Sequence, residues 1–186
     1  MKRILFILFS FFYLNALSQK NLLPDSSMLK AMHPDGYKDS NKFFKKFDAF
    51  STDGNLYIDD SLKSKTTFIN FWFEGCLPCI AEFPALNDLY DRYKTNSQFQ
   101  FLSFTFESKE TALRISEKYE LKYPVIHIER EDIHRLIFNL GFPTSMITDK
   151  LGKIRFIICG GFQEKEKAKE RIDSIYIKEI ERVLND

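Results

Sequence analysis

The sequence predicts an α/β protein in which helices are layered against a β-sheet. Three observations support this class: strand-like runs alternate with helical patterns, a pair of strands joined by a short turn follows, and an amphipathic helix closes the chain. The 186 residues are 44% hydrophobic and 28% charged, without a long Gly/Ser/Pro-rich tract. This composition is typical of one globular domain. The formal charge of +1 gives no electrostatic case for a nucleic-acid partner.

The first half of the predicted domain contains a hairpin, a buried strand and a helix. Short extended runs on either side of Asp53-Gly54 predict the hairpin, because glycine tolerates the positive φ of a tight turn. Residues 65–73, KTTFINFWF, are β-branched or aromatic almost throughout, which is typical of a strand buried on both faces. Apolar residues then recur at helical spacing from Ile80 to Tyr93. Pro78 suits the first turn of this helix, and Pro84 predicts a kink.

The second half repeats the alternation and then ends in a hairpin and a helix. The expected elements are a strand at 99–106, a helix at 108–121, a strand at 123–129, a helix at 131–141 ended by Gly141, strands at 144–149 and 153–159 turned at 150–152, and an amphipathic helix at 164–184. We find no internal repeat and no domain boundary inside residues 46–186.

Residues 1–18 have the layout of a secretory signal peptide. Lys2 and Arg3 precede an apolar run of 11 residues, and the small residues Ala16 and Ser18 suit a cleavage site. A membrane-spanning helix needs about 17–25 residues, so we expect no stable membrane insertion after cleavage. The alternative is an uncleaved N-terminal anchor. The sequence therefore predicts an extracytoplasmic, periplasmic protein, with residues 19–45 as an irregular leader packed loosely on the domain.

The segment Cys76-Leu77-Pro78-Cys79 lies at the predicted junction of the buried strand and the helix. Unpaired N–H groups and the helix dipole favour a thiolate at Cys76, whereas Cys79 lies one turn further in and is shielded. This arrangement predicts that Cys76 attacks a substrate disulfide and that Cys79 resolves the mixed disulfide. A zinc ribbon would need a second such pair, which the sequence lacks.

This segment resembles the active site of the thioredoxin superfamily, and more closely that of the extracytoplasmic TlpA/ResA-like thiol–disulfide oxidoreductases. The motifs that carry the resemblance are Asn70-Phe71-Trp72, Cys76-Leu77-Pro78-Cys79, Glu82-Phe83-Pro84 and Gly141-Phe142-Pro143-Thr144. Their order and spacing match the family from about residue 47 to the C-terminus. The resemblance implies a thioredoxin-like fold, with a central mixed sheet flanked by helices and an N-terminal β-hairpin.

The resemblance also implies an activity. The expected protein is an exported thiol–disulfide oxidoreductase that forms a Cys76–Cys79 disulfide and reduces disulfides in extracytoplasmic proteins. Its electrons would come from a membrane thiol–disulfide carrier, and it would need no cofactor and no metal. Glu82 matches a buried glutamate that can serve as general base for the resolving thiol. A solvent-exposed helix residue is the alternative for this position.

Four residues are implied to contact the substrate: Leu77, Pro78, Phe142 and Pro143. The family proline at the position of Pro143 is cis, and an ordinary trans turn proline is the alternative. One departure concerns docking, because the family usually has tryptophan where this chain has Gly75. The aromatic lid over the site is therefore missing.

Several alternatives remain open from the sequence. The fold could serve as a binding module with a structural disulfide or a copper-binding role, or the enzyme could act as a net oxidase. Cys159 is expected to be a buried small residue, with a third redox-active thiol as the alternative. A peroxiredoxin is excluded, because no cysteine follows a Pro-x-x-x-Thr-x-x pattern.

Overall fold

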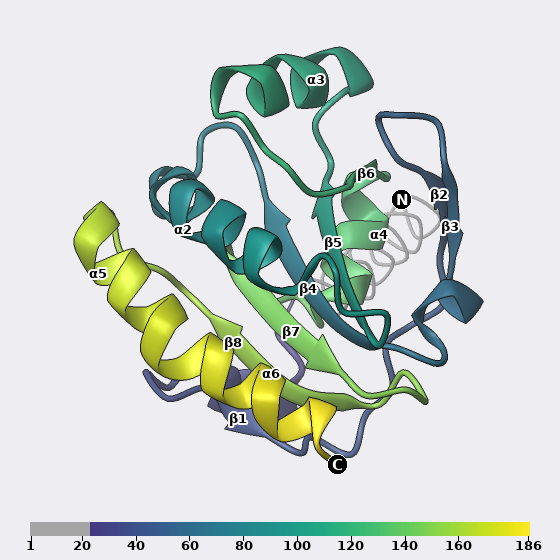
Figure 1. The fold of residues 1–186 in the computed structure, drawn as a ribbon, viewed down its shortest axis with the longest axis vertical. Coiled ribbons are helices and arrows are strands. Elements are labelled where there is room, and N and C mark those ends of the chain that lie inside the picture. The colour runs from purple at the N-terminus through teal and green to yellow at the C-terminus, as the bar shows by residue number, and fades with distance from the viewer. Residues whose placement is uncertain (1–22) are drawn as a thin grey trace, which may run out of the picture.

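A six-stranded mixed sheet forms the centre of the computed structural model, which describes residues 23–186 (Figure 1). In spatial order its strands are β1 (Tyr37–Lys38), β8 (Ile154–Cys159), β7 (Thr144–Thr148), β4 (Thr66–Trp72), β5 (Phe99–Thr105) and β6 (Val125–His127). Strands β4, β5 and β6 run parallel, whereas β7 pairs antiparallel with β4, β8 with β7, and β1 with β8. The predicted signal peptide, residues 1–18, lies outside the described residues.

The predicted N-terminal hairpin is present as a separate two-stranded sheet. Strands β2 (Asp48–Phe50) and β3 (Leu56–Ile58) pair antiparallel around the Asp53-Gly54 turn, where Gly54 has a φ of 91°. Ser51 forms an isolated antiparallel bridge with Ile126, which holds the hairpin beside β6. A short 3₁₀ helix, η2 (Asp59–Leu62), then leads into β4.

Helices cover both faces of the sheet (Figure 1). On one face lie α2 (Leu77–Tyr93), α3 (Lys109–Lys118) and the C-terminal helical stretch of α5 (Lys165–Arg171), η3 (Ile172–Tyr176) and α6 (Ile177–Leu184). On the other face lie α4 (Arg130–Leu136) and the 3₁₀ helix η1 (Ser26–Met32).

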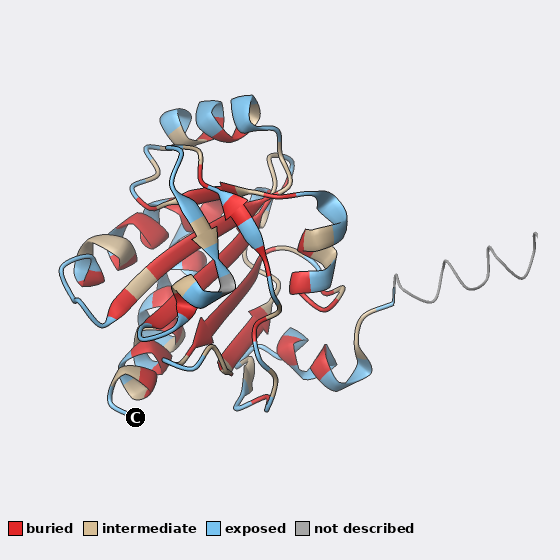
Figure 2. Cartoon of the chain, turned by 90° about the vertical axis from the view of Figure 1, so that its right-hand side faces the viewer, coloured by how far each residue is buried: buried red, intermediate tan, exposed pale blue. Residues whose placement is uncertain are grey.

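Strand β4 explains this layering. All seven of its residues are buried, as the continuous apolar run predicts for a strand covered on both sides. Phe68 packs toward α2 and the C-terminal stretch, and Trp72 packs toward α2 and α3. Ile69 and Phe71 pack toward α4 and η1 on the other face. Figure 2 shows the buried sheet between helices whose outer surfaces are exposed. The expected thioredoxin-like architecture is therefore confirmed by the layers and the mixed sheet.

The expectation of a loosely packed, irregular leader is wrong for residues 23–45. Met28 and Ala31 of η1 are fully buried, and Phe44 joins the same core. Residues Tyr37 and Lys38 add β1 to the sheet edge. The polar composition hid this packing, because a 3₁₀ helix needs only two apolar residues spaced three apart to bury one face.

Two helices differ from their predicted form. Helix α4 ends at Leu136 and not at Gly141, because Phe138 and Asn139 adopt positive φ values of 55° and 57° and stop the helix. The C-terminal stretch has the expected range, but its centre, Ile172–Tyr176, is a π-helical turn. Among residues 23–186, no helix combines the length and the apolar character needed to cross a bilayer.

Candidate active site

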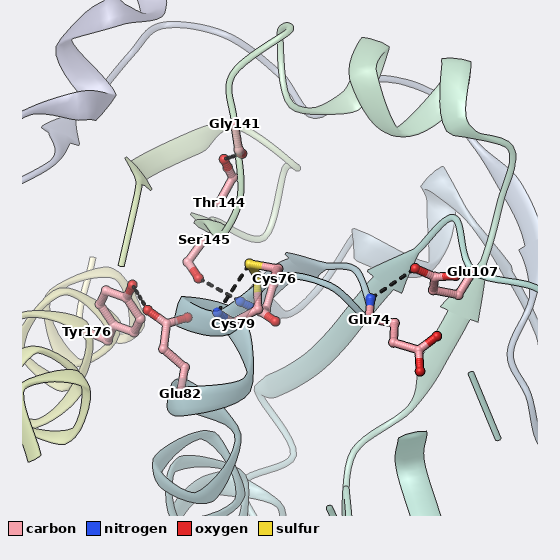
Figure 3. Close-up of a disulfide and its surroundings, with 10 residues drawn as sticks. Glu74, Cys76, Cys79, Glu82, Glu107, Gly141, Thr144, Ser145 and Tyr176 are labelled. Atoms are coloured by element: carbon pink, nitrogen blue, oxygen red, sulfur yellow. Dashed lines mark hydrogen bonds between the residues drawn. A yellow bond between two sulfur atoms is a disulfide. The ribbon is translucent and has the colours of Figure 1, made fainter. Parts of the chain in front are cut away.

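The two cysteines lie where β4 gives way to α2, as predicted. Cys76 is the N-cap residue of α2, and its Sγ accepts a hydrogen bond from the backbone N–H of Cys79 at 3.2 Å. The backbone N–H of Cys76 donates to the carbonyl of Phe73 at 3.1 Å, which closes the turn that precedes the helix. The two cysteines are joined as a disulfide, with their Cα atoms 5.2 Å apart (Figure 3).

The two sulfur-bearing residues are unequally accessible. Cys76 is 5% exposed and Cys79 is 1% exposed, while Leu77 between them is 60% exposed. The N-cap position also leaves Cys76 next to the unpaired N–H groups of the first helical turn, which stabilise a thiolate. The N-terminal cysteine is therefore the better placed of the two for attack on an external disulfide.

A proline loop lies against the cysteine segment. The Phe142–Pro143 peptide bond is cis, and Pro143 is buried. Its carbonyl accepts a hydrogen bond from the N–H of Gly160 at 2.8 Å. A Cβ atom at Gly161 would lie 2.8 Å from Cγ of Pro143 and 3.0 Å from Cβ of Pro78. The two prolines therefore lie so close to Gly161 that no side chain fits at this position.

Glu82 lies beneath the disulfide on the inner side of α2 (Figure 3). It is fully buried, so the exposed alternative is wrong for this side chain. Burial raises the pKa of Glu82 from 4.5 to about 8, and the charge of Arg171 and a hydrogen bond from Tyr176 oppose this rise. The Tyr176 hydroxyl donates to Oε1 at 3.5 Å, whereas Oε2 has no hydrogen-bond partner within residues 23–186.

Other polar groups are buried below the site. The side-chain amide of Asn70 donates to Oγ of Ser145 at 3.1 Å, which links the neighbouring strands β4 and β7. The indole N–H of Trp72 donates to Oγ of Ser103 at 2.8 Å. These bonds fix the strand end from which the cysteine loop departs.

Sequence reasoning missed an aromatic wall beside the disulfide. The rings of Phe73, Phe106 and Phe142 lie 5.2 to 5.7 Å apart, and the guanidinium of Arg130 lies 3.6 Å from the Phe106 centroid. A Cβ atom at Gly75 would lie 3.2 Å from the ring of Phe73. The wall therefore places aromatic surface beside Gly75, where the expected tryptophan is missing. Its sequence signal was the phenylalanine that directly follows each of the parallel strands β4 and β5.

Charged groups hold the loop before Cys76. The backbone N–H of Glu74 donates to Oε1 of Glu107 at 2.9 Å (Figure 3). The Glu74 carboxylate pairs with Arg114 at 2.6 Å. The carboxylate of Glu74 also raises the pKa of the Arg114 guanidinium. These contacts connect the cysteine loop to the loop that follows β5 and to α3.

The remaining cysteine and the histidines are dispersed. Cys159 is half-buried and lies opposite Thr144 in the β7–β8 register. A Cβ atom at Gly141 would lie 3.7 Å from its Sγ, an ordinary van der Waals distance. Within residues 23–186, no three His, Cys, Asp or Glu side chains are grouped so that they could hold a metal ion.

Residues 41–157 match the AhpC/TSA family. Thiol-disulfide oxidoreductase ResA of Geobacillus kaustophilus is 32% identical over 114 residues, which cover 61% of this chain and 64% of that protein. The chain therefore spans slightly less than two thirds of the length of this curated relative.

Solved structures show the same fold. The thioredoxin domain of a thiol-disulfide oxidoreductase from Bacteroides vulgatus matches with a TM-score of 0.59 at 20% identity, over 72% of this chain and 94% of that one. A thiol:disulfide interchange protein of the thioredoxin family from Chlorobium tepidum matches with a TM-score of 0.58 at 21% identity, over 73% of this chain and 96% of that one.

A mixed sheet with a Cys-x-x-Cys disulfide at the start of its first long helix defines a thioredoxin-like protein. Within that class, the match over well over half of its length shows that the chain belongs to the AhpC/TSA family.

Proposed function

We propose that this protein is an exported thiol–disulfide oxidoreductase that uses the Cys76–Cys79 couple to reduce disulfides in extracytoplasmic proteins. The observation that carries the proposal is the position of Cys76 at the N-cap of α2, more exposed than Cys79 and hydrogen-bonded to its backbone N–H. The similarity to ResA supports the same chemistry.

Each reductive cycle transfers two electrons from the cysteine pair to the substrate. The Cys76 thiolate attacks one sulfur of the substrate disulfide, so that a mixed disulfide forms and the other substrate sulfur leaves as a thiolate. Because the pKa of Glu82 is about 8, a fraction of the molecules carries the carboxylate near neutral pH, and this carboxylate takes the proton of Cys79. The Cys79 thiolate then attacks the Cys76 sulfur. The second substrate thiolate then leaves, and the Cys76–Cys79 disulfide remains. A dithiol donor, in the cell a membrane thiol–disulfide carrier, reduces the pair again.

The substrate would be bound beside the disulfide. Leu77 offers an exposed apolar side chain, and Pro78 lies beside it. Phe142 packs against the cluster that contains both cysteines, and Pro143 lies with Pro78 around Gly161. An extended peptide that carries the target cysteine would contact these four residues.

Export of the protein rests on residues 1–18. The charged, apolar and small-residue layout of this segment supports secretion through a cleaved signal peptide, and hence an extracytoplasmic, periplasmic location. Residues 46–186 would then form the thioredoxin-like domain, to which residues 23–45 contribute core residues.

Covalent trapping tests the enzymatic role. We expect reduced Cys79→Ser protein, in a Cys159→Ser background, to accumulate a mixed disulfide with insulin on Cys76. The matched Cys76→Ser protein should form none. The wild-type protein should accelerate the precipitation of insulin by dithiothreitol. If Cys79→Ser traps no insulin and the wild-type protein does not accelerate precipitation, the disulfide is structural.

The direction of electron flow is tested by the reduction potential of the Cys76–Cys79 couple, measured against glutathione or dithiothreitol buffers. We expect a value of about −300 mV, as befits a reductant. A value of about −120 mV would instead identify a net oxidase.

A further inference from the structure

The C-terminal helical stretch changes its hydrogen-bonding pattern where it passes the active site. Helix α5 ends at Arg171, the π-helical turn η3 covers Ile172–Tyr176, and α6 continues from Ile177. Single π turns inside α-helices are rare, and those that occur are often at functional sites. Such a turn widens the helix and redirects a side chain. Here the turn ends at Tyr176, whose side chain points toward α2 (Figure 3).

Tyr176 contacts the carboxyl group that lies beneath the disulfide. Its hydroxyl lies 3.5 Å from Oε1 of Glu82, although the two residues are 94 positions apart. Tyr176 is 1% exposed and Glu82 is fully buried, so bulk water does not replace this contact. The other carboxyl oxygen, Oε2, has no partner among residues 23–186. Oε1 of Glu82 is therefore held by the Tyr176 hydroxyl, and Oε2 is available to accept a proton.

Cys79 and Glu82 lie three residues apart and hence on the same face of α2. The groups that face Glu82 from the surrounding elements are Tyr176 of η3, Arg171 of α5 and Tyr123 before β6. Only Arg171 carries a charge. Burial raises the pKa of the Tyr176 hydroxyl, and the Glu82 carboxyl raises it further, so this hydroxyl remains a donor at neutral pH.

We propose that Tyr176 is a positioning residue of the exchange site, which holds Oε1 of Glu82 and stabilises the carboxylate while Oε2 receives the proton of Cys79. The inference rests on the proposed function. The S–H bond of Cys79 breaks and the proton moves to Oε2, so the resulting thiolate can attack the Cys76 sulfur of the mixed disulfide. The Cys76–Cys79 bond forms, and the bond from Cys76 to the substrate breaks with departure of a substrate thiolate.

The two chemical steps can be separated with 5,5′-dithiobis(2-nitrobenzoate). Reduced protein in a Cys159→Ser background releases one coloured thiolate when Cys76 attacks, and a second when Cys79 resolves the mixed disulfide. We expect Tyr176→Phe to leave the rate of the first release unchanged. The pH midpoint of the second release should rise by about half to one unit, so this step should be roughly three- to tenfold slower below the midpoint.

Tyr93→Phe is the matched control. The Tyr93 hydroxyl donates to Oε1 of Glu181 at 2.5 Å, so this variant also removes a tyrosine–glutamate hydrogen bond between α2 and the C-terminal stretch. It should not move the pH midpoint of either release. Thermal unfolding of both variants measures any loss of packing separately, because a purely structural role lowers the melting temperature without moving the pH profile.

The outcomes distinguish the inference from the proposed function. If Glu82→Gln slows the second release while Tyr176→Phe has the wild-type pH midpoint, the role of Tyr176 is refuted and the function stands. If Glu82→Gln resolves as fast as the wild type, Glu82 is not the general base, and the role of Tyr176 is refuted with it. If protein that lacks Cys76 gives the first release as fast as protein that has it, the proposed function itself is refuted.

Discussion

Replacing Glu82 by glutamine measures the free energy with which burial opposes a charge beneath the disulfide. The side chain is fully buried, and burial raises its pKa from 4.5 to about 8. The folded state therefore holds a proton at pH values where the unfolded chain has lost it. Because a pKa that is raised on folding makes stability fall as pH rises, the wild-type protein should lose stability between these two values.

The magnitude follows from the size of the shift. One pKa unit corresponds to about 1.4 kcal/mol, so the wild-type free energy of unfolding should fall by about 4 kcal/mol between pH 5 and pH 9 from this group. The loss should be complete once the pH exceeds the folded-state value. Glutamine keeps the shape of the side chain and cannot ionise, so Glu82→Gln should lack this loss. The variant should be more stable than the wild type at pH 9.

Urea unfolding of the oxidised protein at several pH values provides the measurement. Subtraction of the Glu82→Gln curve from the wild-type curve removes the contributions of all other titrating groups. Glu117→Gln removes an exposed carboxylate of α3 and serves as control, with the wild-type slope expected. If the curves of wild type and Glu82→Gln run parallel from pH 5 to pH 9, burial does not hold this carboxyl neutral, and the reasoning is refuted.

Two further predictions concern packing. Gly161→Ala would place a Cβ atom 2.8 Å from Cγ of Pro143, so the proline loop must move and the rate of attack by the Cys76 thiolate should fall roughly tenfold or more. Gly141→Ala, whose added Cβ atom would have its nearest contact at 3.7 Å, should retain the wild-type rate. Equal rates for the two variants would contradict the close approach of Gly161 to Pro143. Met28→Ala should lower the free energy of unfolding by about 2–5 kcal/mol, because the side chain is fully buried. Met32→Ala, at a residue that is 59% exposed, should change it by less than about 0.5 kcal/mol, and a similar small effect of Met28→Ala in urea unfolding would show that the leader is not part of the core.

Local patterns were sufficient for the elements that carry the cysteines. The continuous apolar run of β4 and the helical period of α2 are both short-range signals, and the junction between them places Cys76 at the helix N-terminus. The hairpin β2–β3 was equally predictable from the sequence, because the Asp53-Gly54 turn specifies it within a few residues. Backbone preferences and side-chain periodicity act over one or two turns, which is why these features could be predicted.

Features made by contacts between distant segments could not be predicted in this way. The burial of Met28 depends on a surface supplied by the sheet and α4, and neither is encoded near residue 28. The bond from Tyr176 to Glu82 depends on how the C-terminal stretch crosses α2, including a π turn that has no clear sequence signal. The sequence alone determined that a strand–cysteine–helix junction exists. Only tertiary packing decided which groups surround it, because burial and distance are properties of the folded chain.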